Sequence, residues 1–159
     1  MNINVFIEVS KDSNIKYEHD HVKGKLYVDR ILHTPMTYPY NYGYIPDSLA
    51  GDGDPLDVMV VTDYILMPGC LIKCKILGVL KTEDEKGADE KIIAVPMENI
   101  DPYMKSVNEL SDLKSSQRDK IKFFFENYKK LESDKWVKVK GWGDKEEAIQ
   151  VYKVSQIIV

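Results

Sequence analysis

The sequence predicts an α+β fold that is mainly β, in which two main helices pack against a small closed antiparallel β-barrel. Short segments typical of strands follow one another between residues 2 and 97, with Gly, Pro and Asp between them. Two later segments instead repeat their apolar residues with the 3.6-residue period of a helix. The length of 159 residues is that of one ordinary domain, so we expect a single domain over residues 1–159.

The individual strands are predicted from alternation and from β-branched residues. We expect strands at residues 3–9 (INVFIEV), 25–32 (KLYVDRIL), 56–62 (LDVMVVT), 70–82, 91–97 and 135–142 (KWVKVKGW), with a polar loop at 83–90 and irregular chain or short helix at 98–114. The run at 56–62 is continuously apolar rather than alternating. So many short strands in one small domain favour an OB-like barrel.

Each of the two helices has a periodic apolar face. Within residues 111–133 the stripe consists of Ile121, Phe124, Phe125, Tyr128 and Leu131. Within residues 143–159 the residues expected on one face are Ala148, Val151, Tyr152 and Ser155, with Ile158 close by. Asp144 is the expected N-cap of the second helix, because acidic residues follow it in the first turn.

Composition and charge limit the possible classes of protein. The formal net charge is −4, and lysines and acids are interleaved, whereas nucleic-acid binders usually carry a basic excess. No stretch approaches the roughly 20 apolar residues of a membrane span, and the first residues do not resemble a signal peptide. Cys70 and Cys74 would lie ~13 Å apart on one strand face, too far for a disulfide. We therefore expect reduced thiols and a cytoplasmic protein.

The segment DGDPLDV, residues 52–58, places Asp52, Asp54 and Asp57 within six positions. Asp-Gly-Asp-Pro alone indicates a solvated turn. Asp57, however, begins an apolar strand, where a carboxylate needs a partner, and a divalent cation is the natural one. The segment does not fit a calcium-binding EF-hand loop, because that loop needs a glycine at its sixth position, where Asp57 stands here.

A second acidic cluster lies in residues 83–90 and includes Asp84 and Asp89. Taken alone it indicates an exposed hairpin tip. Together the two acidic clusters allow several cations side by side, and two Mg²⁺ ions ~3.5–4 Å apart are typical of phosphoryl-transfer sites.

Four tyrosines at strand spacing form the third conspicuous feature: Tyr38, Tyr40, Tyr42 and Tyr44. They could pack as an aromatic ribbon, stack on nucleic-acid bases, or direct hydroxyl groups at phosphate oxygens. Arg30, shortly before them, supports the phosphate interpretation, because arginine binds phosphate with a planar fork of donors.

The histidines carry less information. His19 and His21 are spaced like a metal-binding pair, although a single H-x-H on a polar segment is more often at the surface, and His33 is expected to be structural.

These residues together resemble the soluble family I inorganic pyrophosphatases. The pattern Asp-x-Asp-Pro-x-Asp at 52–57 is specific to that family, and KYE (16–18), VDR (28–30) and YPYNYGYIP (38–46) precede it in the same order. The likeness continues through IIAVP (92–96), FFFENYKKLE (123–132) and KWVKVKGW, and covers roughly residues 5–143. Length and order resemble the small bacterial-type members, which implies a homo-oligomer, with a hexamer favoured.

The resemblance implies six metal-binding carboxylates, namely Glu8, Glu18, Asp52, Asp57, Asp84 and Asp89. Asp52, Asp57 and Asp89 would hold the first activating metal, and Asp57 would also reach the second. Asp84 and Asp89 would bind a third metal that arrives with the substrate. Glu8 would contact a fourth metal, and Glu18 would act through metal-bound water. The implied cofactor is Mg²⁺, three to four ions per active site, with Mn²⁺ or Zn²⁺ as possible substitutes.

The remaining matching positions concern the substrate. The residues implied to bind phosphate are Lys16, Arg30, Tyr38, Lys91, Tyr128 and Lys129. Those implied in catalysis are Asp54 as general base, Tyr42 beside the nucleophile, and Arg30 and Lys129 beside the departing phosphate. The implied reaction is hydrolysis of pyrophosphate to two orthophosphates. A Mg-activated water held between metal ions would attack directly, without a covalent intermediate.

Three other functions use some of the same residues. A non-catalytic phosphate- or calcium-binding module would use the acids without requiring the cations to converge with them. A barrel that binds single-stranded nucleic acid would use the tyrosines, although the acidic clusters oppose it. A hydrolase of nucleotides or polyphosphate is closer still. We expect pyrophosphate as the small-molecule partner, and neither nucleic acid nor a membrane.

Overall fold

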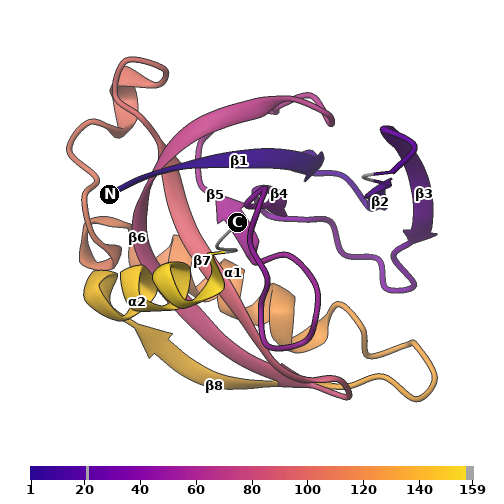
Figure 1. Cartoon of the computed structure of the whole chain (residues 1–159). Helices are drawn as coiled ribbons and strands as arrows, with labels where there is room; N and C mark the ends of the chain where they lie inside the picture. Colours follow the sequence, from indigo (N-terminus) through magenta and orange to yellow (C-terminus); the bar gives the residue numbers. More distant parts are fainter. Residues whose placement is uncertain (21, 157–159) are drawn as a thin grey trace.

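The computed structural model describes residues 1–20 and 22–156 of the chain (Figure 1). Its strands are β1 (Asn2–Val9), β2 (Ile15–Asp20), β3 (Lys25–Ile31), β4 (Asn41–Tyr44), β5 (Asp57–Val60), β6 (Leu71–Asp84), β7 (Gly87–Pro96) and β8 (Val137–Gly143). Its helices are α1 (Ser115–Asn127) and α2 (Lys145–Ser155), with short 3₁₀ turns at η1 (Pro102–Met104) and η2 (Leu110–Asp112). The prediction of a mainly-β fold with two main helices is confirmed. In these two ranges no helix has both the length and the apolar character needed to cross a membrane.

Six strands form one sheet in the order β1-β4-β5-β7-β6-β8, and β1 also pairs with β6. The pairings therefore run from β1 through β4, β5, β7 and β6 back to β1. The prediction of a wholly antiparallel arrangement is wrong for one pair, because β5 and β7 are parallel, with Asp57 opposite Lys91. A parallel pair needs a long crossover connection. Residues 61–86, which contain β6, provide it.

Alternate residues of the central strands pack into two different buried clusters. Val58 and Val60 of β5 lie in a cluster that also contains Ala148 of α2. Met59, between them, lies in the cluster that contains Phe124 and other residues of α1. Because both faces of β5 are buried after Asp57, its remaining residues are all apolar instead of alternating.

The helical predictions hold except at the end of the first stripe. Four of its members are buried, but Leu131 is 65% exposed, because α1 ends at Asn127 and the chain then turns. The Asp144 side chain accepts a hydrogen bond from the Glu147 amide at 3.0 Å, which confirms the predicted N-cap of α2. Of the residues expected on the buried face of α2, Ala148 and Ser155 are buried and Val151 and Tyr152 half-buried, while Ile158 lies outside the described residues.

Three details of the strand prediction are wrong or incomplete. The polar loop expected at 83–90 is mostly strand, since β6 and β7 pair down to Asp84 opposite Gly87. The sequence patterns also did not predict β2, whose residues are largely polar, and did not delimit β4.

Both cysteines are free, as expected. Strands β2 and β3 form a separate two-stranded sheet beside β1 (Figure 1), and this β2–β3 hairpin covers part of the site described next.

Candidate active site

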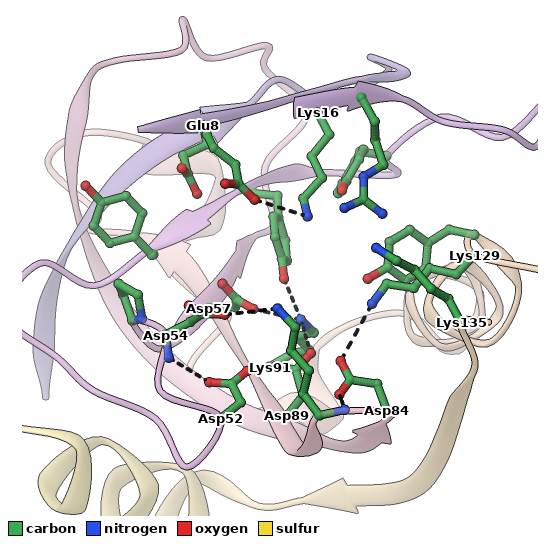
Figure 2. Close-up of a pocket in the computed structure, with 18 of the residues that line it drawn as sticks. Glu8, Lys16, Asp52, Asp54, Asp57, Asp84, Asp89, Lys91, Lys129 and Lys135 are labelled. Atoms are coloured by element: carbon green, nitrogen blue, oxygen red, sulfur yellow. Dashed lines mark hydrogen bonds and ion pairs between the residues drawn. The ribbon is translucent and has the colours of Figure 1, made fainter. Parts of the chain in front are cut away.

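A single cavity of about 300 Å³ collects all the site residues proposed from the sequence. Its lining includes Glu8, Lys16, Glu18, Arg30, Tyr38, Tyr42, Asp52, Asp54, Asp57, Asp84, Asp89, Lys91, Tyr128 and Lys129. They come from β1 to β7, from the segments before β4 and β5 and from the residues directly after α1. Figure 2 shows Asp57 and Asp89 on either side of Lys91, with Lys16 and Lys129 pointing toward the same space. Residues far apart in the sequence thus form one site of mixed charge, while their individual roles stay predictions.

The acidic loop before β5 is held by its own backbone. The Ala50 amide donates to the Asp54 carbonyl at 2.8 Å, and the Gly53 amide donates to the Ala50 carbonyl at 3.1 Å. Gly53 has a φ of +87°, which glycine adopts without steric cost. The Asp54 amide also donates to Asp52 Oδ1 at 3.0 Å. Burial, with Asp54 and Asp89 nearby, raises the pKa of the Asp52 carboxyl above its ordinary value.

Lys91 lies between two acids of the cavity, Asp57 and Asp89, and is 3% exposed. Its Nζ lies 2.7 Å from Asp57 Oδ2 and 2.8 Å from Asp89 Oδ2, and it donates to the Tyr42 hydroxyl at 2.7 Å. The strand geometry explains this arrangement, because Asp57 is the register partner of Lys91, and Asp89 precedes Lys91 by two residues on the same face. Burial alone would lower the pKa of Lys91, but its partners, Asp57 foremost, raise it well above its ordinary value.

Further acids of the cavity come from the β6–β7 hairpin and from β1. Asp84 and Asp89 are 6% and 8% exposed, so the interpretation of this segment as a solvated tip is wrong for these two residues. Their side chains point to the cavity because the paired strands continue almost to the turn. On β1, burial raises the pKa of Glu8 to about 7, although its hydrogen bond from the His19 amide opposes the shift.

Cations face these acids from the other elements. Lys129 Nζ lies 3.6 Å from Asp84 Oδ2, and burial lowers the pKa of Lys129. Arg30 Nε donates to Asp29 Oδ2 at 2.7 Å, and Arg30 also donates to Glu132. Lys16 Nζ lies 3.8 Å from Asp29. The cavity therefore holds cationic donors for an anion and carboxylates for a cation within one space.

The donor set fits a hard divalent cation. Within residues 1–20 and 22–156, no three His, Cys, Asp or Glu side chains are placed to enclose one metal ion as they stand. The Lys91 ammonium lies between Asp57 and Asp89 and satisfies their charge. The facing groups are nevertheless carboxylate oxygens, the ligands preferred by Mg²⁺ and Ca²⁺.

Several cavity residues are not among the site residues implied by the sequence, namely His19, Tyr44, Pro55, Glu85, Lys86 and Lys135. His19 is half-buried, so the expectation of a surface histidine is wrong for it, and His21 lies outside the described residues. The position of His19 directly after Glu18 was the available signal. It was not informative because β2 itself was not predicted.

Fold and site together define a class of protein: a small mainly-β protein whose carboxylates and cationic side chains share one cavity and can bind a metal ion together with an anion. A family model described as inorganic pyrophosphatase matches residues 5–157. The chain is 55% identical over 156 residues to an inorganic pyrophosphatase of Nanoarchaeum equitans, covering 98% of this chain and 96% of the relative. It is 53% identical over 152 residues to that of Rickettsia prowazekii, covering 95% and 88%.

Solved structures agree with the sequence comparisons. An inorganic pyrophosphatase from Coxiella burnetii superposes with a TM-score of 0.95 at 46% identity, over 97% of this chain and 92% of that chain. The Helicobacter pylori inorganic pyrophosphatase gives a TM-score of 0.95 at 49% identity, over 97% and 91%. The chain belongs to the family I inorganic pyrophosphatases, hydrolases that act on diphosphate. The resemblance seen in the sequence is confirmed.

Proposed function

We propose that the chain hydrolyses inorganic pyrophosphate to two orthophosphates in this cavity, with Mg²⁺ as the cofactor. The observation that carries the proposal is the convergence of the carboxylates and the phosphate-binding cations on one space of about 300 Å³. A binding module that used the acids alone would not need the cations in the same cavity. The whole chain, residues 1–159, would act as one domain, and its ring of strands as an OB-like barrel.

The six carboxylates divide into two groups by their proposed roles. Asp57 and Asp89 pair with Lys91 and, together with Asp52 from the loop before β5, would hold the activating ions. Asp84, Glu8 and Glu18 also line the cavity and would contact ions that come with the substrate. When bound, Mg²⁺ would neutralise the substrate's charge and lower the pKa of a water molecule. Three to four ions per site are proposed, with Mn²⁺ or Zn²⁺ as substitutes.

The side chains of the opposite wall would grip and orient the substrate. Lys16, Arg30 and Lys129 present cationic donors to phosphate oxygens, and the charge that develops on the departing phosphate would be stabilised by Arg30 and Lys129. Arg30 donates to Asp29 through Nε and to Glu132 through Nη1, and a guanidinium has five N–H donors, so it can bind phosphate while keeping both carboxylates. The hydroxyl groups of Tyr38, Tyr42 and Tyr128 complete the cavity wall and, being neutral, donate without adding charge.

Asp54 is proposed as the general base. Its side chain is 65% exposed, and its nearest cation, Lys86 Nζ, lies 4.0 Å away. It therefore stays accessible to a water molecule in the cavity and is not committed to a close ion pair. A water that loses its proton to Asp54 attacks phosphorus directly, so no covalent enzyme intermediate is required.

Phosphate release measured with pyrophosphate, ATP and tripolyphosphate, each with Mg²⁺, Mn²⁺ or Zn²⁺, tests the proposal. We expect release from pyrophosphate with Mg²⁺ to be far faster than from the other substrates. Faster release from ATP or tripolyphosphate would favour a nucleotide or polyphosphate hydrolase. We also propose a cytoplasmic homo-oligomer, with a hexamer favoured, which sedimentation of the purified chain tests.

A further inference from the structure

The β2–β3 hairpin carries several cavity residues but is not part of the six-stranded sheet. Lys16 and Glu18 on β2 and Arg30 on β3 all line the cavity. In the part of the chain that the structure describes, the ladder of β2 joins only β3, and the hairpin stands at one side of β1 (Figure 1). The position of these three side chains therefore depends on the contacts that seat the hairpin against the larger sheet.

One such contact is made by the ring of His19 on β2. It stacks on Phe6 of β1 with ring centroids 4.3 Å apart and an interplanar angle of 16°. It also lies nearly parallel to the ring of Tyr44 on β4, at 6.3 Å. A hydrogen bond of 2.7 Å joins His19 Nδ1 and the Tyr44 hydroxyl. Phe6 and Tyr44 are register partners, so the imidazole rests on a cross-strand aromatic pair of the main sheet.

The same residue also orients an acid of the cavity. The main-chain amide of His19 donates to Glu8 Oε2 at 2.8 Å. Glu8 follows Phe6 by two residues on β1, so both side chains lie on the face that meets the hairpin. The seating of the His19 ring on Phe6 therefore brings its amide within reach of the Glu8 carboxylate.

We propose that His19 is a positioning residue, whose ring seats the β2–β3 hairpin on Phe6 and Tyr44 and thereby sets the placement of Glu8, Lys16, Glu18 and Arg30 in the cavity. The proposal rests on the proposed function for its kinetic readout only. His19 itself does not contact substrate in this account. It acts through the side chains that its hairpin carries.

The test compares three single variants and one double variant at a temperature well below their unfolding midpoints. His19→Ala removes both the stack and the hydrogen bond, and we expect the KM for pyrophosphate and the Mg²⁺ concentration for half-maximal rate to rise on the order of tenfold. His19→Phe keeps the stack, and Tyr44→Phe removes the same hydrogen bond from the other side. Each of these two variants should raise the KM for pyrophosphate and the Mg²⁺ requirement about threefold. The double variant His19→Phe/Tyr44→Phe should raise both kinetic values by less than the product of the two single effects, because both substitutions remove the hydrogen bond that joins these two side chains.

A matched control and a second readout separate positioning from general stability. His33→Ala removes an exposed histidine and should leave both kinetic values unchanged. Amide hydrogen exchange of the whole chain should accelerate in residues 15–20 and 25–31 of His19→Ala while α1 and β7 stay protected. If the wild-type chain releases no phosphate, the proposed function alone is overturned. Hydrogen exchange and calorimetric Mg²⁺ binding still test the positioning role of His19 in that case. The positioning role is wrong if His19→Ala matches His33→Ala in KM, Mg²⁺ requirement and hairpin exchange.

Discussion

The ammonium of Lys91 compensates two carboxylates, so its removal should destabilise the fold by a calculable amount. Its Nζ lies 2.7 Å from Asp57 and 2.8 Å from Asp89, so the two interacting oxygens are at most about 5.5 Å apart. In Lys91→Met, a side chain of similar length without charge, they face each other directly. At an effective dielectric constant of about 20 their repulsion is about 3 kcal/mol.

That value agrees with the roughly 3–5 kcal/mol lost when one partner of a buried ion pair is removed. We expect the lower end of this range, because the Asp57 side chain is 26% exposed and water screens it. Urea unfolding in the presence of a chelator should therefore show Lys91→Met to be about 3 kcal/mol less stable than the wild type. Added Mg²⁺ should recover more stability in the variant than in the wild type, since a divalent cation replaces the missing charge.

Lys81→Met provides the matched control. Lys81 Nζ lies 3.0 Å from Glu147 Oε1, but both side chains are more than a third exposed. Exposed pairs contribute about 0–1 kcal/mol, so this variant should unfold close to the wild type. The reasoning is refuted if the two variants lose equal stability, or if Mg²⁺ raises the urea midpoint of both by the same amount.

Three further outcomes are expected. Asp54→Asn should lower turnover by orders of magnitude in a phosphate-release assay while leaving the circular dichroism spectrum intact, because its side chain is 65% exposed; near-normal activity would exclude it as the base. Asp57→Asn should raise the Mg²⁺ concentration needed for half-maximal rate, and an unchanged requirement would count against ligation. Gly43→Ala should cost more than about 4 kcal/mol in urea unfolding, because a Cβ would lie 1.8 Å from the Phe6 carbonyl oxygen, whereas Gly51→Ala, whose Cβ meets nothing within 4 Å, should stay within about 0.5 kcal/mol. Equal stability of the two glycine variants would contradict the steric argument.

Local sequence patterns predicted the strands and helices whose buried residues recur at regular positions. The apolar run around Val58 and the stripe through Phe124 each match a face, or both faces, of one element, so they can be read without knowledge of the neighbours. The crowding of Asp52, Asp54 and Asp57 was equally readable, because an acid at the start of an apolar strand requires a partner.

Features that depend on pairing between distant segments could not be read this way. Nothing in the local sequence indicates that β5 lies parallel to β7, and this pairing is what places Asp57 opposite Lys91. Asp84 and Asp89 looked like loop acids because their neighbours are polar, yet strand pairing directs both into the cavity. His19 was missed for the same reason, since its stacking partner Phe6 is contributed by another strand.

The ion pairs of the cavity suggest why metal and substrate binding should depend on each other. Lys91 is paired with Asp57 and Asp89, and Lys129 lies beside Asp84, so each of these cations already has a carboxylate neighbour. Phosphate oxygens and carboxylates compete for the same N–H donors. If divalent cations take over these carboxylates, as proposed above, they would release those donors to phosphate, and bound phosphate would in turn leave the carboxylates to the metal. By linkage each ligand would then strengthen the binding of the other by the same factor.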